Sequence, residues 1–110
     1  MVAICEAATQ TELTPLHAAV MHRHAEVVAE LLRHGVNTEC RTGDGATAVY
    51  LAAQLASAPI VRLLLAGGAS PYAVVTDRAS SRFGHSPLTA AALNGDHGTM
   101  RILYDASVLQ

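Results

Sequence analysis

The chain has 110 residues, a size that suits one domain, and its formal net charge of −2 gives no electrostatic reason to bind nucleic acid. Hydrophobic residues make up 51% of the sequence, but aromatic residues make up only 4%, and tryptophan is absent. The core must therefore be close-packed from small and aliphatic side chains, without the bulky rings on which most cores rely.

The sequence predicts neither a membrane span nor a secreted protein. The most apolar stretch, residues 46–69, is interrupted by Pro59 and Arg62, and the first ten residues lack the basic and apolar segments of a secretory leader. The two cysteines, Cys5 and Cys40, show no CxxC spacing. We therefore expect a chain of the cytoplasm or nucleus, with both thiols reduced and no membrane insertion.

The stretch TPLHAAV, which begins at Thr14, has the pattern of a helix start. The Thr14 hydroxyl can accept a hydrogen bond from an orphan N–H, and Pro15 suits the first helical position because its φ is already fixed there. We expect a short helix that ends near Arg23, with Leu16 and Ala19 on its buried face.

A second helix is predicted from about Ala25 to His34, with Gly35 closing it in the left-handed conformation. Apolar residues recur along it at helical spacing. The buried stripe of this helix is expected to consist of Val27, Val28, Leu31 and Leu32.

The same pattern occurs twice more. TAVYLAA begins at Thr47, 33 residues after TPLHAAV, and SPLTAAA begins at Ser86, another 39 residues on. Ser57 and Asp96 are the expected N-caps of the second helices in these later units, and Gly68 is the expected closing glycine of the middle one. A fixed period of this length indicates a stacked repeat array.

Short links with turn residues join the units. Gly43-Asp44-Gly45 can form a hairpin turn with positive φ. The third link is six residues longer than the second, and we expect the extra residues to extend a loop at one edge of the stack. The predicted organisation is one domain, 1–110, with repeats at 9–41, 42–74 and 75–110 and a longer loop at 69–85.

TPLHAAV, RHAEVVAELLRHGVN and GDGATAVYLAA resemble the ankyrin repeat, and the resemblance covers roughly residues 9–107. Some positions depart from the family pattern: Ala48 and Tyr50 replace the usual proline and histidine, Thr89 replaces a histidine, and Glu12 replaces a glycine. The resemblance implies an all-α repeat solenoid of stacked helix–loop–helix units, with the links projecting as short β-hairpin fingers.

The resemblance also implies a non-catalytic module that binds another protein or peptide segment through the concave face of the first helices and through the finger tips. The positions that correspond to the family's contact residues are Thr11, Leu13, Met21 and His22 in the first repeat, Asp44, Ala46, Gln54 and Leu55 in the second, and Arg82, Phe83, His85, Leu93 and Asn94 in the third.

Five of these residues are large and apolar, and their gathering on one face favours an interaction site. They are Leu13, Met21, Leu55, Phe83 and Leu93. The alternative is that some of them pack beneath the third finger or cover an end of the stack. Arg82 and Phe83 are the expected anchor pair, because arginine and aromatic residues are enriched at binding hot spots.

No catalytic, cofactor-binding or metal-binding residue is predicted. Four histidines lie in the first repeat, but a zinc site needs converging ligands with a supporting shell. The resemblance implies that His17 instead hydrogen-bonds backbone and ties neighbouring loops. Gly43-Asp44-Gly45 lacks the lysine of a phosphate-binding loop, and Ser86 is placed to cap a helix, not to act as a nucleophile. Glu26 and Glu30 are expected on a solvated helix face.

A competing hypothesis is a structural spacer, or a fragment of a longer array, that self-associates through uncapped repeat ends. Repeat arrays usually end in units with a polar outer face, and TMRILYDASVLQ shows no obvious one. A third hypothesis is metal or small-molecule sensing through the histidines of the first repeat.

Overall fold

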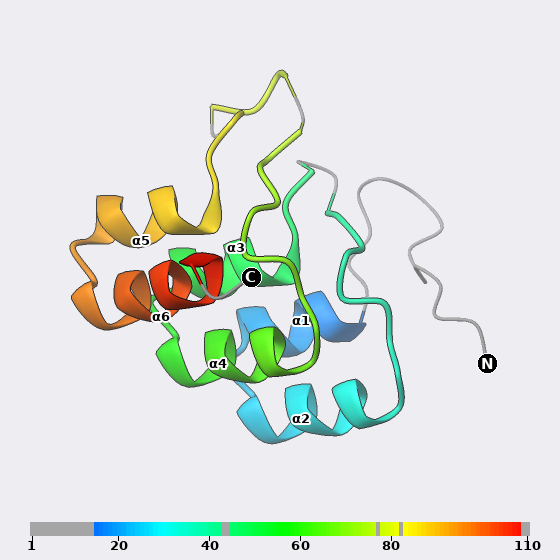
Figure 1. The fold of residues 1–110 in the computed structure, drawn as a ribbon. Coiled ribbons are helices and arrows are strands. Elements are labelled where there is room, and N and C mark those ends of the chain that lie inside the picture. Colours follow the sequence, from blue (N-terminus) through cyan, green and yellow to red (C-terminus); the bar gives the residue numbers. More distant parts are fainter. Residues whose placement is uncertain (1–14, 43–44, 77, 82, 109–110) are drawn as a thin grey trace.

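The computed structural model describes residues 15–42, 45–76, 78–81 and 83–108, and these form three helix pairs (Figure 1). The inner helices α1, α3 and α5 pack side by side, as do the outer helices α2, α4 and α6. No described residue is in a β-strand, so the fold is an all-helical repeat stack. The helices are α1 (Pro15–Met21), α2 (Ala25–Arg33), α3 (Ala48–Gln54), α4 (Ala58–Ala66), α5 (Pro87–Asn94) and α6 (His97–Val108).

The inner helices begin with the capping residues that the sequence predicts. The Thr47 hydroxyl accepts a hydrogen bond from the Tyr50 N–H at 3.4 Å, and the Ser86 hydroxyl accepts one from the Thr89 N–H at 3.1 Å. Both caps have extended backbone, which aims the side-chain oxygen at an orphan N–H of the first turn. Thr14, the corresponding residue of the first repeat, lies outside the described residues.

The outer helices begin differently from one another. The Asp96 carboxylate accepts hydrogen bonds from the Thr99 N–H and hydroxyl, and these bonds hold the pKa of Asp96 below its ordinary value. Ser57 is the N-cap residue of α4, as expected, but its side chain makes no capping hydrogen bond. Ser57 has a ψ of 76°, so it lacks the extended backbone of a capping residue, and its buried hydroxyl has no partner in the described part of the chain.

The predicted buried stripe of α2 is confirmed except at Val27. Val28 is fully buried, and Leu31 and Leu32 pack partly buried against the core. Val27 is 46% exposed, whereas Ile60, its counterpart in α4, is 2% exposed. This position faces the preceding helix pair. Among the described residues, α2 has no such pair to pack against, and Val27 therefore remains open to solvent.

The two helices of each pair are joined by one repeated geometry. Its key residue has left-handed backbone at all three equivalent positions: φ is 62° at Arg23, 58° at Ala56 and 68° at Gly95. In each case the next residue donates its N–H to the carbonyl five residues back, the hydrogen bond of a Schellman motif. Gly35 and Gly68 also have positive φ, as expected for residues that close the outer helices.

Cys40 differs from expectation. Its side chain is buried and its sulfur is in a disulfide, so the expectation of a reduced thiol at this position is wrong. Cys5, the other cysteine of the sequence, lies outside the described residues. Disulfide formation depends on the approach of two Cα atoms in space, which the spacing along the sequence does not reveal.

Candidate protein-binding face

The candidate contact residues of the inner helices lie at the carboxyl ends of α1, α3 and α5. Because these helices pack side by side in the same direction, their ends are neighbours across one face of the stack. Met21 is 45% exposed and Leu93 is 71% exposed, while Leu55 is partly buried. We call this set the helix-end row; it comprises Met21, His22, Gln54, Leu55, Leu93 and Asn94.

Asn94 has a structural role within this row. Its side-chain amide donates hydrogen bonds to the carbonyls of Ala53 and Gln54, at 3.2 and 2.7 Å. These carbonyls belong to the last turn of α3, where backbone acceptors lack partners within the helix. Asn94 therefore ties the end of α5 to the end of α3 and fixes the spacing of the helix-end row.

The finger before α3 and the finger before α5 have the same base. The Thr42 N–H donates to the Ala46 carbonyl and the Gly45 N–H donates to the Thr42 carbonyl. The third link repeats this arrangement with Val75 bonded to His85 and Gly84. In each finger base, one residue of the first arm pairs with two consecutive residues of the second arm. The first of these two residues is a glycine with positive φ, Gly45 or Gly84, as in a G1 β-bulge.

The insertion therefore lies at the tip of the third finger. Two residues, 43–44, separate the paired positions of the earlier finger, and eight residues, 76–83, separate those of the later one, which accounts for all six extra residues. The helices that flank the finger keep their places in the stack, as expected (Figure 1).

The third finger carries most of the remaining exposed apolar surface. Phe83 is 50% exposed at the tip, whereas His85 is partly buried at the base. Tyr72 and Val74 are also exposed on the ascending arm, and the sequence analysis did not select them. The sequence carried no signal for them, because PYAVVT has valine both at exposed position 74 and at buried position 75.

Several of the candidate contact residues do not contribute to a described surface. Ala46 was expected to be exposed, but its side chain is fully buried under the finger base. Thr11, Leu13, Asp44 and Arg82 lie outside the described residues.

Arg41 connects the two fingers, and sequence reasoning missed it. Its guanidinium Nη1 donates to the Gly45 carbonyl of its own finger and to the Val74 carbonyl of the next, both at 2.7 Å. A second tie runs from the Ser70 N–H to the Glu39 carboxylate at 3.1 Å. These bonds between successive links position the exposed side chains of the third finger.

His17 has the backbone-bonding role that the resemblance implies. The His17 ring is buried and its Nε2 donates to the Cys40 carbonyl at 2.9 Å, which ties α1 to the link that follows α2. Burial lowers the pKa of His17, and the hydrogen bond with Cys40 offsets part of this effect. His22 and His24 are exposed, and the described residues include no group of three or more potential metal ligands.

The outer face of α2 is a solvated, charged surface. Glu30 pairs with Arg33 and His34, and its pKa is lowered mainly by the hydrogen bond from Arg33. All three side chains are exposed, so these pairs contribute little to stability. No helix in the described part of the chain is long and apolar enough to cross a membrane.

Comparison with known proteins agrees with this architecture. A family model described as ankyrin repeats (3 copies) matches residues 2–75, and the chain belongs to the ankyrin repeat family. It is 33% identical over 102 residues to mouse Ankyrin repeat and SOCS box protein 16, covering 86% of this chain and 21% of that protein. It is 35% identical over 78 residues to Calmodulin-binding transcription activator 4 of Arabidopsis thaliana, covering 71% of this chain and 8% of that protein.

The chain thus spans about a fifth or less of the length of these two relatives. Ankyrin repeats generally act as protein–protein interaction modules and generally lack catalytic activity. The helix pair α5–α6 lies beyond the region that the family model matches, yet it has the helix junction and finger base of the preceding pair.

Proposed function

We propose that residues 1–110 form one non-catalytic module that binds another protein or a peptide segment through the helix-end row and the third finger. The observation that carries this proposal is the exposure of Met21 and Leu93 on inner helices that pack against the core through other residues. The packing of the stack does not require large apolar side chains there, because Gln54 occupies the equivalent position of α3.

The energetic contribution of these side chains to binding would be substantial. Full burial of a leucine or methionine side chain contributes about 1.5–3 kcal/mol. Phe83 would add an aromatic contact at the finger tip, a residue type that supplies large contact area at low entropic cost. We infer a partner that presents an apolar segment to the helix-end row, with Arg82 and polar groups of the finger adding specificity.

The experiment compares charge insertion at the proposed face with charge insertion elsewhere. Met21→Arg combined with Leu93→Arg introduces two charges into the helix-end row at side chains that are already exposed. Val27→Arg is a matched control, because Val27 is as exposed as Met21 but lies on outer helix α2. Far-UV circular dichroism and urea unfolding verify that all variants keep the native fold.

A binding partner isolated with the wild-type chain should bind Val27→Arg with unchanged affinity. The Met21→Arg, Leu93→Arg variant should lose at least about 100-fold in affinity, since a hot-spot substitution typically costs 2 kcal/mol or more. Equal affinity for the double variant and the wild type would show that the partner binds another surface.

The alternative function is a spacer or fragment of a longer array that self-associates at an uncapped end. The exposed apolar face of α5–α6 favours this second candidate.

A further inference from the structure

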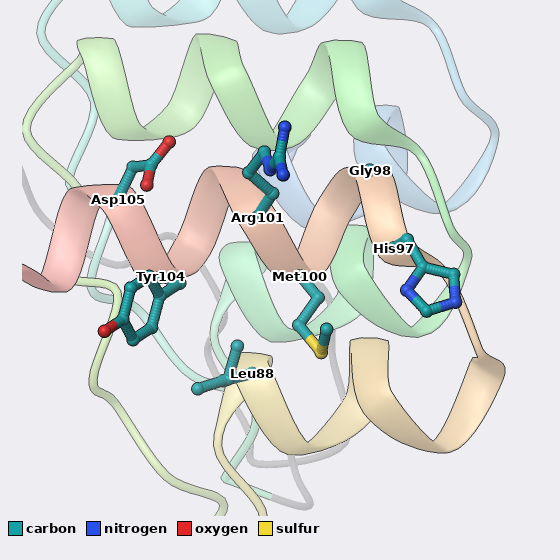
Figure 2. Close-up of a pocket in the computed structure, with 7 residues that line it drawn as sticks. All are labelled: Leu88, His97, Gly98, Met100, Arg101, Tyr104 and Asp105. Carbon is teal, nitrogen blue, oxygen red and sulfur yellow. The ribbon is translucent and has the colours of Figure 1, made fainter.

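The last helix pair has an apolar end face that no other described element covers. Leu88 of α5 and Met100 and Tyr104 of α6 line an open hollow of about 910 Å³ (Figure 2). His97 lies at one end of the hollow, and Arg101 and Asp105 lie along one edge. We call this surface the α5–α6 end face.

The preceding repeats show that the positions of Leu88 and Met100 are core positions. In the first repeat the equivalent residues Leu16 and Val28 are buried, and in the second Val49 and Val61 are fully buried. Each of those faces is covered by the helix pair that follows it. In the third repeat Leu88 and Met100 are only partly buried, and Tyr104 is 58% exposed.

The opposite end of the stack has a different character. Leu63 and Ile102 pack against the core, but the equivalent residue of α2 is Glu30, which is exposed and paired with Arg33 and His34. A head-to-tail contact would place these charged side chains over the apolar hollow, where their desolvation is unfavourable. Val27 is the exposed apolar residue on this side of α2, so the described surface of α2 is only partly apolar and matches the α5–α6 end face less well than a second copy of that face.

The charges of the end face are complementary to those of the same face on a second copy whose α6 helix runs in the opposite direction. Arg101 and Asp105 are one helical turn apart and project from the same edge of α6 (Figure 2). In the described part of the chain neither belongs to an ion pair. A two-fold axis perpendicular to α6 and parallel to the face places each Arg101 opposite the Asp105 of a second copy. An axis parallel to α6 would instead carry both side chains of the second copy to the opposite edge of the interface, away from their partners.

We propose that the α5–α6 end face binds the same face of a second copy of this chain, with the two α6 helices antiparallel about that axis. The apolar centre of Leu88, Met100 and Tyr104 then packs against its own counterpart. Two Arg101–Asp105 pairs then lie side by side along one edge of the apolar centre and fix the antiparallel orientation, since electrostatic complementarity sets register and excludes wrong pairings. The residues of the end face are not those of the helix-end row, so the proposal does not rest on the binding function proposed above.

One helix pair presents an interface near the small end of the range for specific complexes, and we therefore expect a micromolar dissociation constant. Sedimentation velocity of the wild-type chain from about 1 to about 500 μM covers that range. The wild type should shift from monomer to dimer as concentration rises. Sedimentation as a monomer at the highest concentration would overturn the proposal.

Charge reversal identifies the face and the orientation. Arg101→Asp and Asp105→Arg each create like-charge contacts in the proposed dimer, and each should weaken dimerisation by about 100-fold. A mixture of these two single variants should form a heterodimer, because one then presents two acidic side chains and the other two basic ones. The double variant Arg101→Asp, Asp105→Arg should dimerise with itself like the wild type.

Arg62→Asp is the matched control, because Arg62 is the exposed counterpart of Arg101 on α4 and lies outside the end face. It should leave the dissociation constant unchanged. Circular dichroism shows whether each variant is folded. If folded Arg101→Asp dimerises as strongly as the wild type, or if the two single variants fail to associate when mixed, the antiparallel end-face dimer is wrong.

Discussion

The left-handed residue at the helix junctions allows a direct test of the repeat geometry. Arg23, Ala56 and Gly95 occupy equivalent positions and have nearly the same φ, but only the third repeat has a glycine there. A side chain in the left-handed region costs about 1–2 kcal/mol, because its Cβ approaches the following carbonyl. Ala56→Gly removes this strain, and Gly95→Ala introduces it.

The expected magnitude follows from two opposing terms. Replacing alanine by glycine also increases the entropy of the unfolded chain, which reduces the gain by about 0.4–1 kcal/mol. We therefore expect Ala56→Gly to raise the free energy of unfolding by about 0.5–1 kcal/mol. Gly95→Ala should lower it by a similar amount, and this effect is purely conformational because no atom lies within 4 Å of the added Cβ.

Gly98 provides a control of opposite sign. It lies inside α6, and a Cβ added there meets only the Asp96 carboxylate at an ordinary contact distance of 3.6 Å. Gly98→Ala should stabilise the protein by up to about 1 kcal/mol, because alanine is the better helix former. The same substitution at two glycines three positions apart should thus have opposite effects.

Urea unfolding followed by far-UV circular dichroism measures all three variants, with the m-value expected to remain constant. A change of 1 kcal/mol corresponds to a shift in Tm of about 4 °C for a chain of this size. If Gly95→Ala leaves the stability unchanged, or if Ala56→Gly destabilises the protein, the left-handed junction does not have the energetic role assigned to it.

Three further predictions concern individual hydrogen bonds. Asp96→Ala should destabilise the protein by about 1 kcal/mol in urea unfolding at neutral pH, and by less as the pH falls through the lowered pKa of Asp96, where the wild type itself loses the cap. Stability should fall on acidification below about pH 6.5, because burial lowers the pKa of His17 and the unfolded chain takes up the proton first; His17→Gln should reduce this pH dependence. Arg41→Met should accelerate tryptic cleavage at Arg78 by about 5-fold, since loss of roughly 1 kcal/mol favours opening of the third finger.

Each of these predictions has a contrary outcome. An Asp96→Ala variant as stable as the wild type at pH 7 would show that the cap contributes nothing. Equal slopes of stability against pH for His17→Gln and wild type, between about pH 7 and 5, would assign the pH dependence to other groups. An unchanged cleavage rate in Arg41→Met would mean that the bond to Val74 does not restrain the finger.

Features that depend on local residue identity were predictable from the sequence. The caps at Thr47 and Ser86 follow from the preference for an oxygen-bearing side chain before a helix. The location of the insertion follows from the repeat period. A family resemblance added the role of His17, which no local pattern would have revealed.

Features that depend on what lies alongside a residue were not predictable. Val27 and Ile60 occupy the same repeat position, but only Ile60 has a described helix pair on that side. The hydrogen bond from Arg41 to the Val74 carbonyl joins residues 33 positions apart in two different links. Local sequence preferences do not reveal that these two links lie side by side. Asn94 was selected as a contact residue, yet its amide bonds to the end of α3 because that is where α5 brings it.

The central claim is that the exposed helix-end row is a protein-binding surface. The most direct measurement is the affinity of a captured partner for three chains: the wild type, the Met21→Arg, Leu93→Arg variant and the Val27→Arg control. Isothermal titration calorimetry should show equal affinity for the wild type and the control, and an affinity at least about 100-fold weaker for the folded double variant. The claim is contradicted if the double variant binds as tightly as the wild type, or if Val27→Arg abolishes binding instead.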